Sequence, residues 1–364
     1  MSKPTIITLV PIPTEIPSYK YIIENYNLIN LTLTNSNEIA KTLSKSPFNE
    51  AIAIYGSYPG FFPIGGLSIE LLEKLPKSLK VIGLCSAGFD GYPLNQMKSK
   101  NIRLTHVPTG LAQGDVADCV IWHLLSGIRK FNSWQNKIEK LKGTTYEVRR
   151  ELSGQNNQGF IFGHIVNKKP VRRISGLNAV ILGYGGIGKE TAKRLISMGV
   201  NVTGVVRNPQ KYATGINKSG VAIDQLGVQL LSTSELEKSC TGKDILILCL
   251  PGTENTKNIV DKNLINSLND NCIIINVGRG SLINVEDLKV AFESGKVDHV
   301  GLDVFATEPT IDEYWIDEGS WGTTSLTPHI GVATGESYFQ ACETCMQNIL
   351  NGIENDSWSN VVNW

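Results

Sequence analysis

The apolar residues of this chain gather in short runs, and the segments between many of these runs carry apolar and polar residues at helical spacing. Short apolar runs bounded by Gly, Pro, Asn or Asp are typical of buried strands, and their alternation with amphipathic helices indicates a parallel α/β architecture. In the first third of the chain the pattern predicts strands at residues 5–10, 50–56, 79–86 and 102–107. We therefore expect a small α/β domain there.

A second series of elements follows. A long apolar helix is predicted over residues 114–131, and a polar stretch from about residue 140 to 169 is interpreted as connecting helix and loop on the surface. In the helix that begins at Asn284, that side chain is expected to act as the cap, with Asp287 at the capping-box position. The strands predicted in this part lie in the segments at residues 178–183, 200–206, 244–251, 272–280 and 298–305, and the last three segments end in loop residues.

The glycine-rich turn after the strand at 178–183 has the pattern G-x-G-x-x-G and opens a helix-like segment. In a dinucleotide-binding fold the first glycine permits a tight turn, the second lets backbone approach a pyrophosphate, and the third lets the helix pack close to the strand. The free N–H groups at the start of that helix would bind an anionic phosphate. The alternative is an ordinary glycine-rich turn between a strand and a helix. The candidate cofactor-binding residues are Gly183, Tyr184, Gly185, Gly186, Ile187 and Gly188.

Arg207 ends the next predicted strand, at the place where a dinucleotide-binding protein distinguishes its two cofactors. An acidic residue there would bind the ribose hydroxyl of NAD, whereas Arg can pair with the 2′-phosphate of NADP. Asn208 could donate to the same phosphate and Lys211 could add charge. The pattern favours NADP, with NAD possible; the alternative is that Arg207 is only a solvated residue at a strand end.

Composition limits the class of protein. At 364 residues the chain is long enough for two domains, and its 34 basic and 34 acidic residues cancel, which gives no reason to expect nucleic acid or an anionic membrane as partner. No apolar run is long enough to cross a bilayer, and Pro11, Pro13 and Pro17 interrupt the N-terminal apolar segment. We expect a cytoplasmic protein that binds a small molecule.

The 7 cysteines do not form a pattern typical of disulfides or of a metal site. Cys342 and Cys345 are spaced as C-x-x-C, but they fall in a helical pattern without a second pair. Buried thiols are the simpler interpretation, and we expect no metal.

Four polar residues follow the later strands: Arg279, Asp303, Glu308 and His329. Ligands of doubly wound sheets bind outside the carboxyl ends of the strands, so these side chains should converge. A carboxylate beside an imidazole stabilises its protonated form and fixes its tautomer, which suits a proton donor to a carbonyl. An Arg can bind a carboxylate with two hydrogen bonds and polarise the adjacent keto oxygen. The combination indicates reduction of a 2-keto acid.

These segments also resemble the D-isomer-specific 2-hydroxyacid dehydrogenases over nearly the whole chain. The resemblance rests on GLCSAGFD, LGYGGIGKETAKRL, LILCLPGTENTKNIV, INVGRG, GLDVFATEP and TPHIGVAT, in that order. It implies two Rossmann-like or flavodoxin-like parallel-sheet domains with an active-site cleft between them. Residues 1–109, completed by 332–364, would bind substrate, and residues 110–331 would bind the dinucleotide. A homodimer is also expected.

The resemblance further implies a role for individual residues. Arg279, Glu308 and His329 match the catalytic Arg, Glu and His, and the backbone amides of Ala87 and Gly88 would bind the substrate carboxylate together with Arg279. Asp303 matches the acid that holds the nicotinamide carboxamide. Further candidates for contact with the cofactor are Leu250, Pro251, Thr256, Val277, Gly278 and Gly331.

Within the family, Arg207 and the helix opening at Asp118 look like the NADP-dependent glyoxylate and hydroxypyruvate reductases. Ala306 and Val332 depart from the common pattern, so the substrate range is less defined than the chemistry. Three alternatives stay open: a formate dehydrogenase, disfavoured because that branch carries Gln where this chain has Glu308; a non-enzymatic cofactor sensor similar to the C-terminal-binding-protein co-repressors; and a paralogue that binds cofactor without turnover.

Overall fold

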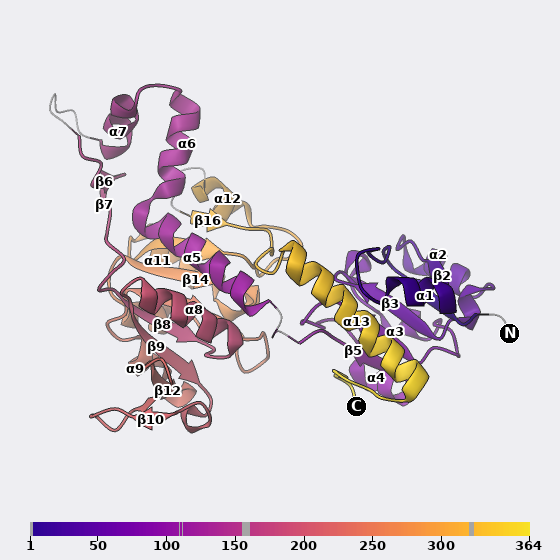
Figure 1. Ribbon diagram of the computed structural model, residues 1–364. Helices are drawn as coiled ribbons and strands as arrows, with labels where there is room; N and C mark the ends of the chain where they lie inside the picture. Colours follow the sequence, from indigo (N-terminus) through magenta and orange to yellow (C-terminus); the bar gives the residue numbers. More distant parts are fainter. Residues whose placement is uncertain (1–2, 109, 111, 155–160, 320–323) are drawn as a thin grey trace. The chain divides into compact units, whose positions relative to one another are not determined.

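A computed structural model describes residues 3–108, 110, 112–154, 161–319 and 324–364. The chain divides into two compact units, Met1–Ala112 with Ala333–Trp364 (unit 1) and Gln113–Val332 (unit 2). The chain thus leaves unit 1, forms unit 2 and returns (Figure 1). Residue 109, where the sequence pattern places a domain boundary, lies outside the described residues.

Unit 1 is built on a parallel sheet with strand order β2-β1-β3-β4-β5, the flavodoxin-like order. Four of these strands coincide with the apolar runs predicted to form them, and only β3 extends past its run, by one residue. The fifth, β2, was not predicted; it is an edge strand whose terminal Asn27 and Asn30 are exposed, so it lacks an apolar run. The strands are β1 (Thr5–Thr8), β2 (Asn27–Asn30), β3 (Ala53–Ser57), β4 (Val81–Leu84) and β5 (Arg103–Thr105).

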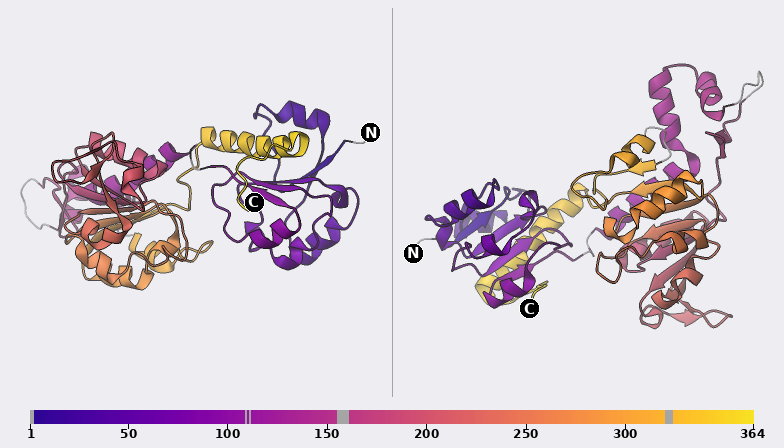
Figure 2. Two further views of the ribbon diagram at one scale, coloured as in Figure 1. Left: turned by 90° about the horizontal axis from the view of Figure 1, so that it is seen from below. Right: turned by 180° about the vertical axis from the view of Figure 1, so that it is seen from behind.

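Helices cover both faces of this sheet, because alternate residues of each strand point to opposite sides. Ile7, Ile54 and Ile82 pack against α2, α3 and α4, while Ile6 and Val81 pack against α1 and the C-terminal helix α13. Figure 2 shows α13, in yellow, lying along the sheet. The helices are α1 (Tyr19–Asn25), α2 (Ser36–Leu43), α3 (Ile69–Leu72), α4 (Leu94–Ser99) and α13 (Gly335–Asn355).

Unit 2 contains a larger sheet with strand order β10-β11-β12-β9-β8-β13-β14-β15-β16. From β12 to β16 all neighbours are parallel, and β10 and β11 add an antiparallel extension. The order β12-β9-β8-β13-β14-β15 is that of a dinucleotide-binding fold. The strands are β8 (Asn178–Leu182), β9 (Asn201–Val206), β10 (Gly215–Ile216), β11 (Ala222–Ile223), β12 (Gln229–Ser232), β13 (Ile245–Leu248), β14 (Cys272–Asn276), β15 (Val297–Leu302) and β16 (Thr324–Leu326).

The central strands of unit 2 are buried on both faces, as expected for a parallel sheet. One face packs against α5 and α8, and the other against α9, α10, α11 and α12 (Figure 1). The predicted α/β class with two parallel sheets is confirmed. The helices are α5 (Gln113–Arg129), α8 (Gly186–Ser197), α9 (Leu236–Cys240), α10 (Lys262–Ser267), α11 (Val285–Glu293) and α12 (Glu313–Gly319).

Two local predictions need correction. The helix predicted over 114–131 ends at Arg129, because Lys130 has a left-handed backbone and its ammonium group forms a buried ion pair with Asp298, at 2.7 Å. Asn284 does cap α11, accepting from the Asp287 N–H, but the Asp287 carboxylate accepts from the Lys262 N–H instead of completing a capping box.

The polar connector contains more regular structure than its composition suggests. It overlaps the end of α6 (Phe131–Leu141) and contains α7 (Thr145–Ser153) and a two-stranded hairpin of β6 (Ile165–Val166) and β7 (Lys169–Pro170). Thr144 and Glu147 form a reciprocal capping box at the start of α7. Within the described residues, no helix is long and apolar enough to cross a membrane and no group of side chains is suited to hold a metal ion.

Candidate active site

The glycine turn joins β8 to α8 at the centre of the unit 2 sheet, where the strand order reverses. Gly183 has a φ of +94°, and a Cβ placed there would lie 2.7 Å from the Cys249 carbonyl carbon. A Cβ at Gly188 would lie 2.5 Å from the carbonyl oxygen of Gly183. Gly185 is the N-cap of α8 and provides no side-chain cap, so the first N–H groups of the helix are suited to bind an anion.

Tyr184, between the first two glycines, is fully buried, and its hydroxyl donates to Asp224 at 2.8 Å. The other Asp224 oxygen accepts from the N–H groups of Leu226 and Val228, so the carboxylate belongs to the β11–β12 turn. Sequence reasoning missed Asp224, which lies outside every motif. Any contact of Tyr184 with a cofactor would therefore involve its backbone.

Arg207, Asn208 and Lys211 are exposed after β9, on and just before a short 3-10 helix (Pro209–Lys211). Lys189 also points into this region: its ammonium lies 4.9 Å from the ring centroid of Tyr212, and that of Lys211 lies 5.9 Å from it. Lys189 and Lys211 thus gather positive charge around Tyr212. Since Lys189 lies on α8, directly after the glycine turn, this charge lies beside the turn.

The loops after β13 and β14 are neighbours of the glycine turn at the same sheet edge. Thr256 donates to the Pro251 carbonyl at 2.7 Å, which closes the loop that also contains Leu250. Val277 and Gly278 are buried, and a Cβ at Gly278 would lie 2.6 Å from the Leu250 carbonyl oxygen. These two loops therefore pack directly on each other.

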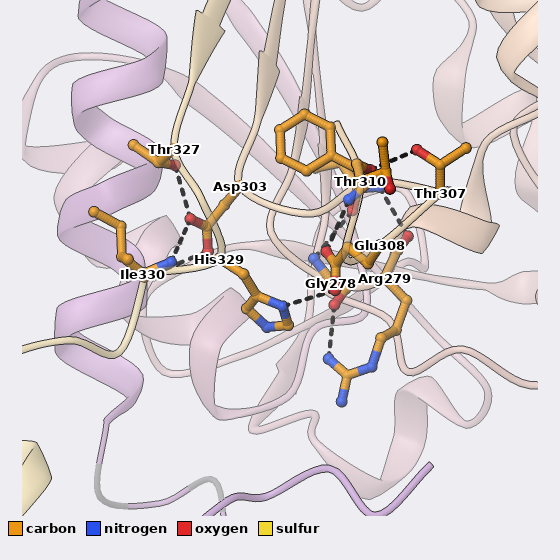
Figure 3. A network of polar contacts seen from close by, with 12 residues as sticks. Gly278, Arg279, Asp303, Thr307, Glu308, Thr310, Thr327, His329 and Ile330 are labelled. Carbon is orange, nitrogen blue, oxygen red and sulfur yellow. Dashed lines mark hydrogen bonds and ion pairs between the residues drawn. The ribbon is translucent and has the colours of Figure 1, made fainter. Parts of the chain in front are cut away.

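His329 and Glu308 form a hydrogen-bonded pair, with 3.1 Å between Nδ1 and Oε2 (Figure 3). Because a carboxylate only accepts hydrogen bonds, the ring proton lies on Nδ1, and Nε2 is left for a substrate. The second Glu308 oxygen accepts from the Phe305 N–H at 2.9 Å, which fixes the carboxylate. The imidazole is about one-third exposed, so it can reach a ligand.

The charge state of Glu308 follows from these contacts. Burial would raise the pKa of Glu308, but the hydrogen bonds from His329 and Phe305 and the charges of His329 and Arg279 outweigh it, and the pKa lies below its usual value. Glu308 is therefore ionised at neutral pH and stabilises a positive charge on the imidazole.

Arg279 follows β14, and its guanidinium donates to the Gly278 carbonyl at 2.8 Å. The Asn276 side chain fixes the backbone of this loop, donating to the Arg279 carbonyl at 2.8 Å and accepting from the Gly278 N–H at 3.0 Å. Figure 3 shows the guanidinium on the same side of the loops as the His329 ring. The structure thus brings Arg279, Glu308 and His329 together.

Asp303 lies deeper than the sequence suggests, at 2% exposed. One of its oxygens accepts from the Thr327 hydroxyl at 2.7 Å and the Ile330 N–H at 2.8 Å, and the other accepts from the Gly331 N–H at 3.0 Å (Figure 3). Asp303 therefore holds the segment on both sides of His329. Sequence reasoning missed Thr327, although it stands in the same TPHIG motif.

Ala87 and Gly88 lie in unit 1, in the loop after β4, and their carbonyl groups are held from within that unit. The Ala87 carbonyl lies 2.9 Å from His106 Nδ1, and the Gly88 carbonyl accepts from the Ser86 hydroxyl at 2.8 Å. Tyr55 on β3 points into the core of unit 1, where its hydroxyl contacts Cys85.

Comparison with known proteins assigns the family. The family model described as "D-isomer specific 2-hydroxyacid dehydrogenase, NAD binding domain" matches residues 121–331. A candidate 2-hydroxyacid dehydrogenase of Saccharomyces cerevisiae is 30% identical, covering 98% of this chain and 96% of its own length. A hydroxypyruvate reductase of Thermotoga maritima is 29% identical over 72% of this chain and 73% of its own.

A solved structure supports the same fold. The NADPH-dependent glyoxylate/hydroxypyruvate reductase of Sinorhizobium meliloti, crystallised with NADP and malonate, superimposes with a TM-score of 0.72 at 21% identity, over 99% of this chain and 97% of that one.

The doubly wound sheet, its glycine turn and the polar cluster at its carboxyl edge define a nicotinamide-dependent oxidoreductase. The chain belongs to the D-isomer-specific 2-hydroxyacid dehydrogenase family, as the sequence motifs indicated, and uses NAD or NADP in the reduction of 2-keto acids.

Proposed function

We propose that this enzyme reduces small 2-keto acids such as glyoxylate and hydroxypyruvate to the D-2-hydroxy acid, with NADPH as the preferred cofactor. The observation that carries the proposal is the pairing of His329 with Glu308 beside Arg279, on the sheet edge that also holds the glycine turn. When bound, the nicotinamide supplies the hydride that reduces the keto carbon.

The residues of the chain have separate tasks in this proposal. His329 donates the proton on Nε2 to the keto oxygen, while Glu308 holds Nδ1 and stabilises the imidazolium. Arg279 binds the carboxylate and polarises the keto group. Ala87 and Gly88 of unit 1 provide backbone amides to the same carboxylate.

We propose that the remaining polar groups bind the cofactor. The glycine turn and the start of α8 bind the pyrophosphate, Arg207 and Asn208 bind the 2′-phosphate of NADP, and Asp303 lies by the nicotinamide. The loops that contain Thr256 and Gly278 lie along the cofactor between its adenosine and nicotinamide ends. The NADP found in the Sinorhizobium reductase structure supports this arrangement by analogy of fold.

The activity can be tested with purified protein by following the oxidation of NADPH through the absorbance of the reduced nicotinamide. We expect turnover with glyoxylate and hydroxypyruvate. Formate oxidation with no keto-acid reduction would support a formate dehydrogenase, and tight cofactor binding without turnover of any 2-keto acid would support a cofactor sensor.

Replacing Arg207 with Asp should reverse the cofactor preference. The wild-type protein should bind NADPH at least about tenfold more tightly than NADH, the scale of one charge-assisted contact, and the variant should prefer NADH. Titrating both cofactors by fluorescence checks this. Lys193→Asp, at an exposed position of α8 outside the proposed phosphate site, is the matched charge control. Equal affinity of the wild type for both cofactors would contradict the assignment.

Replacing Glu308 with Gln should shift the pH profile of reduction toward lower pH. Because its lowered pKa keeps Glu308 negative at neutral pH, Gln removes a charge that stabilises the imidazolium, and less of the proton donor is present at pH 7. The measurement is kcat against pH with saturating cofactor and substrate. An unchanged profile would mean that Glu308 does not support the proton donor.

The same Glu308 ionisation has a defined effect on stability. A carboxyl whose pKa is lowered by folding stabilises the native state above its unfolded pKa, and that contribution is lost as pH falls through the folded pKa. The difference in unfolding free energy between wild type and Glu308→Gln, measured by chemical denaturation across pH, should therefore shrink as pH falls below about 4.3, the ordinary value for Glu.

We also propose that the enzyme is a homodimer. Trp122 on α5 and Phe131, Ile138 and Leu141 on α6 are exposed apolar side chains of unit 2, and such side chains are typical of subunit interfaces. Light scattering would give twice the chain mass of 39.8 kDa if this is correct and the chain mass if it is not.

A further inference from the structure

A line of buried polar side chains runs through unit 2 and ends at Asp303. His299 Nε2 lies 2.9 Å from the Ser325 hydroxyl, which lies 2.7 Å from His123 Nδ1. His123 Nε2 lies 3.1 Å from the Thr327 hydroxyl, which donates to Asp303 at 2.7 Å. Both histidines are fully buried, and the residues come from α5, from β15 and the loop after it, and from β16 and the segment that follows it.

The donor and acceptor of every hydrogen bond in this line can be assigned by starting from Asp303, its last residue. The Asp303 carboxylate can only accept hydrogen bonds, so the Thr327 hydroxyl donates its single proton to it. The Thr327 oxygen must then accept a hydrogen bond from His123 Nε2–H. A neutral imidazole with a proton on Nε2 accepts at Nδ1, so Ser325 donates to it. Ser325 in turn accepts from His299 Nε2–H. The line is thus a one-way chain of donors that points toward Asp303.

The charge state of His123 agrees with this assignment. Burial lowers the pKa of His123 to about 4, and the nearby Asp303 charge and a hydrogen bond with the Ser325 backbone offset only part of the effect, so the ring is neutral at pH 7. Cys119 also faces Thr327, with 3.9 Å between the sulfur and the hydroxyl oxygen, and burial raises the pKa of that thiol to about 11. Both neighbours of Thr327 are therefore neutral groups.

The backbone is shaped to hold both histidines. A Cβ at Gly127 on α5 would lie 2.5 Å from the His299 ring, and a Cβ at Gly301 on β15 would lie 2.8 Å from the Cβ of His123. Helix and strand thus each place a glycine against the histidine of the other element, which makes room for that histidine. Such complementarity indicates a built arrangement rather than a chance contact.

The line of hydrogen bonds connects to the region of His329 through Asp303. Its carboxylate accepts from the N–H groups of Ile330 and Gly331, directly after His329. His329 itself has a φ of +56°, a left-handed conformation that a non-glycine residue keeps only when its surroundings impose it. Hydrogen bonds that fix Asp303 therefore also fix the backbone that aims the His329 ring.

We propose that His123 and Thr327 are positioning residues: together with Ser325 and His299 they form a one-way hydrogen-bond chain that orients Asp303 and, through it, the backbone of His329. The effect on catalysis rests on the proposed function of His329, whereas the existence of the hydrogen-bond chain does not. Oriented networks of this kind polarise each successive bond, so a break is expected to weaken the bonds beyond it.

The kinetic test compares two similar substitutions. Thr327→Val removes the hydroxyl that joins His123 to Asp303 and should lower kcat roughly tenfold to a hundredfold, as expected when a reacting group is misplaced. Thr324→Val, three residues earlier on β16, removes a buried hydroxyl that donates to the Trp315 carbonyl and should leave kcat within about twofold. Equal kcat values in the two variants, with similar losses in melting temperature, would overturn the positioning role.

A spectroscopic test needs no turnover. In protein labelled with ¹⁵N-histidine, His123 and His299 should both appear as neutral rings with the proton on Nε2, and His123 should not titrate between about pH 6 and about pH 8. A proton on His123 Nδ1, or a charged His123 ring at neutral pH, would overturn the chain. If these tautomers are found but the wild-type protein reduces no 2-keto acid, the proposed function is wrong, whereas the hydrogen-bond chain is confirmed.

Discussion

Replacing His329 with Ala is expected to abolish 2-keto acid reduction while the affinity for cofactor stays within about threefold. The imidazole acts on the substrate oxygen, and loss of a positioned general acid typically costs about a hundredfold to ten-thousandfold in rate. Because the dinucleotide is bound mainly at the glycine turn and after β9, its binding should not depend on this ring. The measurements are kcat for glyoxylate and the dissociation constant of NADPH.

The left-handed backbone of His329 makes a second variant necessary. Ala at a φ of +56° is strained, whereas Asn tolerates this region, so His329→Asn should retain the loop and still lose activity. His164→Ala, at an exposed histidine just before the β6–β7 hairpin, serves as the control for loss of any histidine. Activity of His329→Asn within tenfold of wild type would exclude a general-acid role.

The fold was predictable because its signals are local. Gly183 and Gly188 meet backbone atoms that leave no room for a side chain, so their spacing in the sequence directly reflects the turn. β13 is apolar at every position, and β14 at every position but its last, Asn276, because both faces of a parallel sheet are buried. Arg279, Glu308 and His329 could be expected at one edge for the same reason, since parallel strands end there together.

The supporting contacts could not be predicted, because they join residues far apart in the sequence. His123 stands in an apolar helical pattern and gives no sign of its bonds to Ser325 and Thr327, about 200 residues later. The bond of Tyr184 to Asp224 likewise joins the glycine turn to a hairpin that lacks any motif. The local pattern around a residue predicts the helix or strand to which it belongs. A buried polar pair depends instead on how two elements pack together, which the local pattern does not contain.

Replacing Arg279 with Lys is expected to cost about 2 to 4 kcal/mol in the efficiency of reduction, or roughly a thirtyfold to thousandfold fall in kcat/KM. Lys keeps the charge but loses the planar pair of donors that can bind a carboxylate and polarise the keto oxygen at once. Glyoxylate and hydroxypyruvate should be affected alike, since the lost contact is to the keto-acid group they share. Steady-state kinetics with both substrates measures the effect.

A structural role for Arg279 predicts a different result, because its guanidinium also donates to the Gly278 carbonyl and its charge acts on Glu308. Titration of the unreactive mimic oxamate in the presence of NADP separates the two roles. Weaker oxamate binding at an unchanged melting temperature identifies a substrate contact, whereas undiminished binding with a lowered melting temperature identifies support of the loop. Arg194→Lys, at an arginine that pairs with Asp118 and Glu190, shows the cost of losing an arginine ion pair elsewhere in unit 2, and should leave kcat/KM within about twofold.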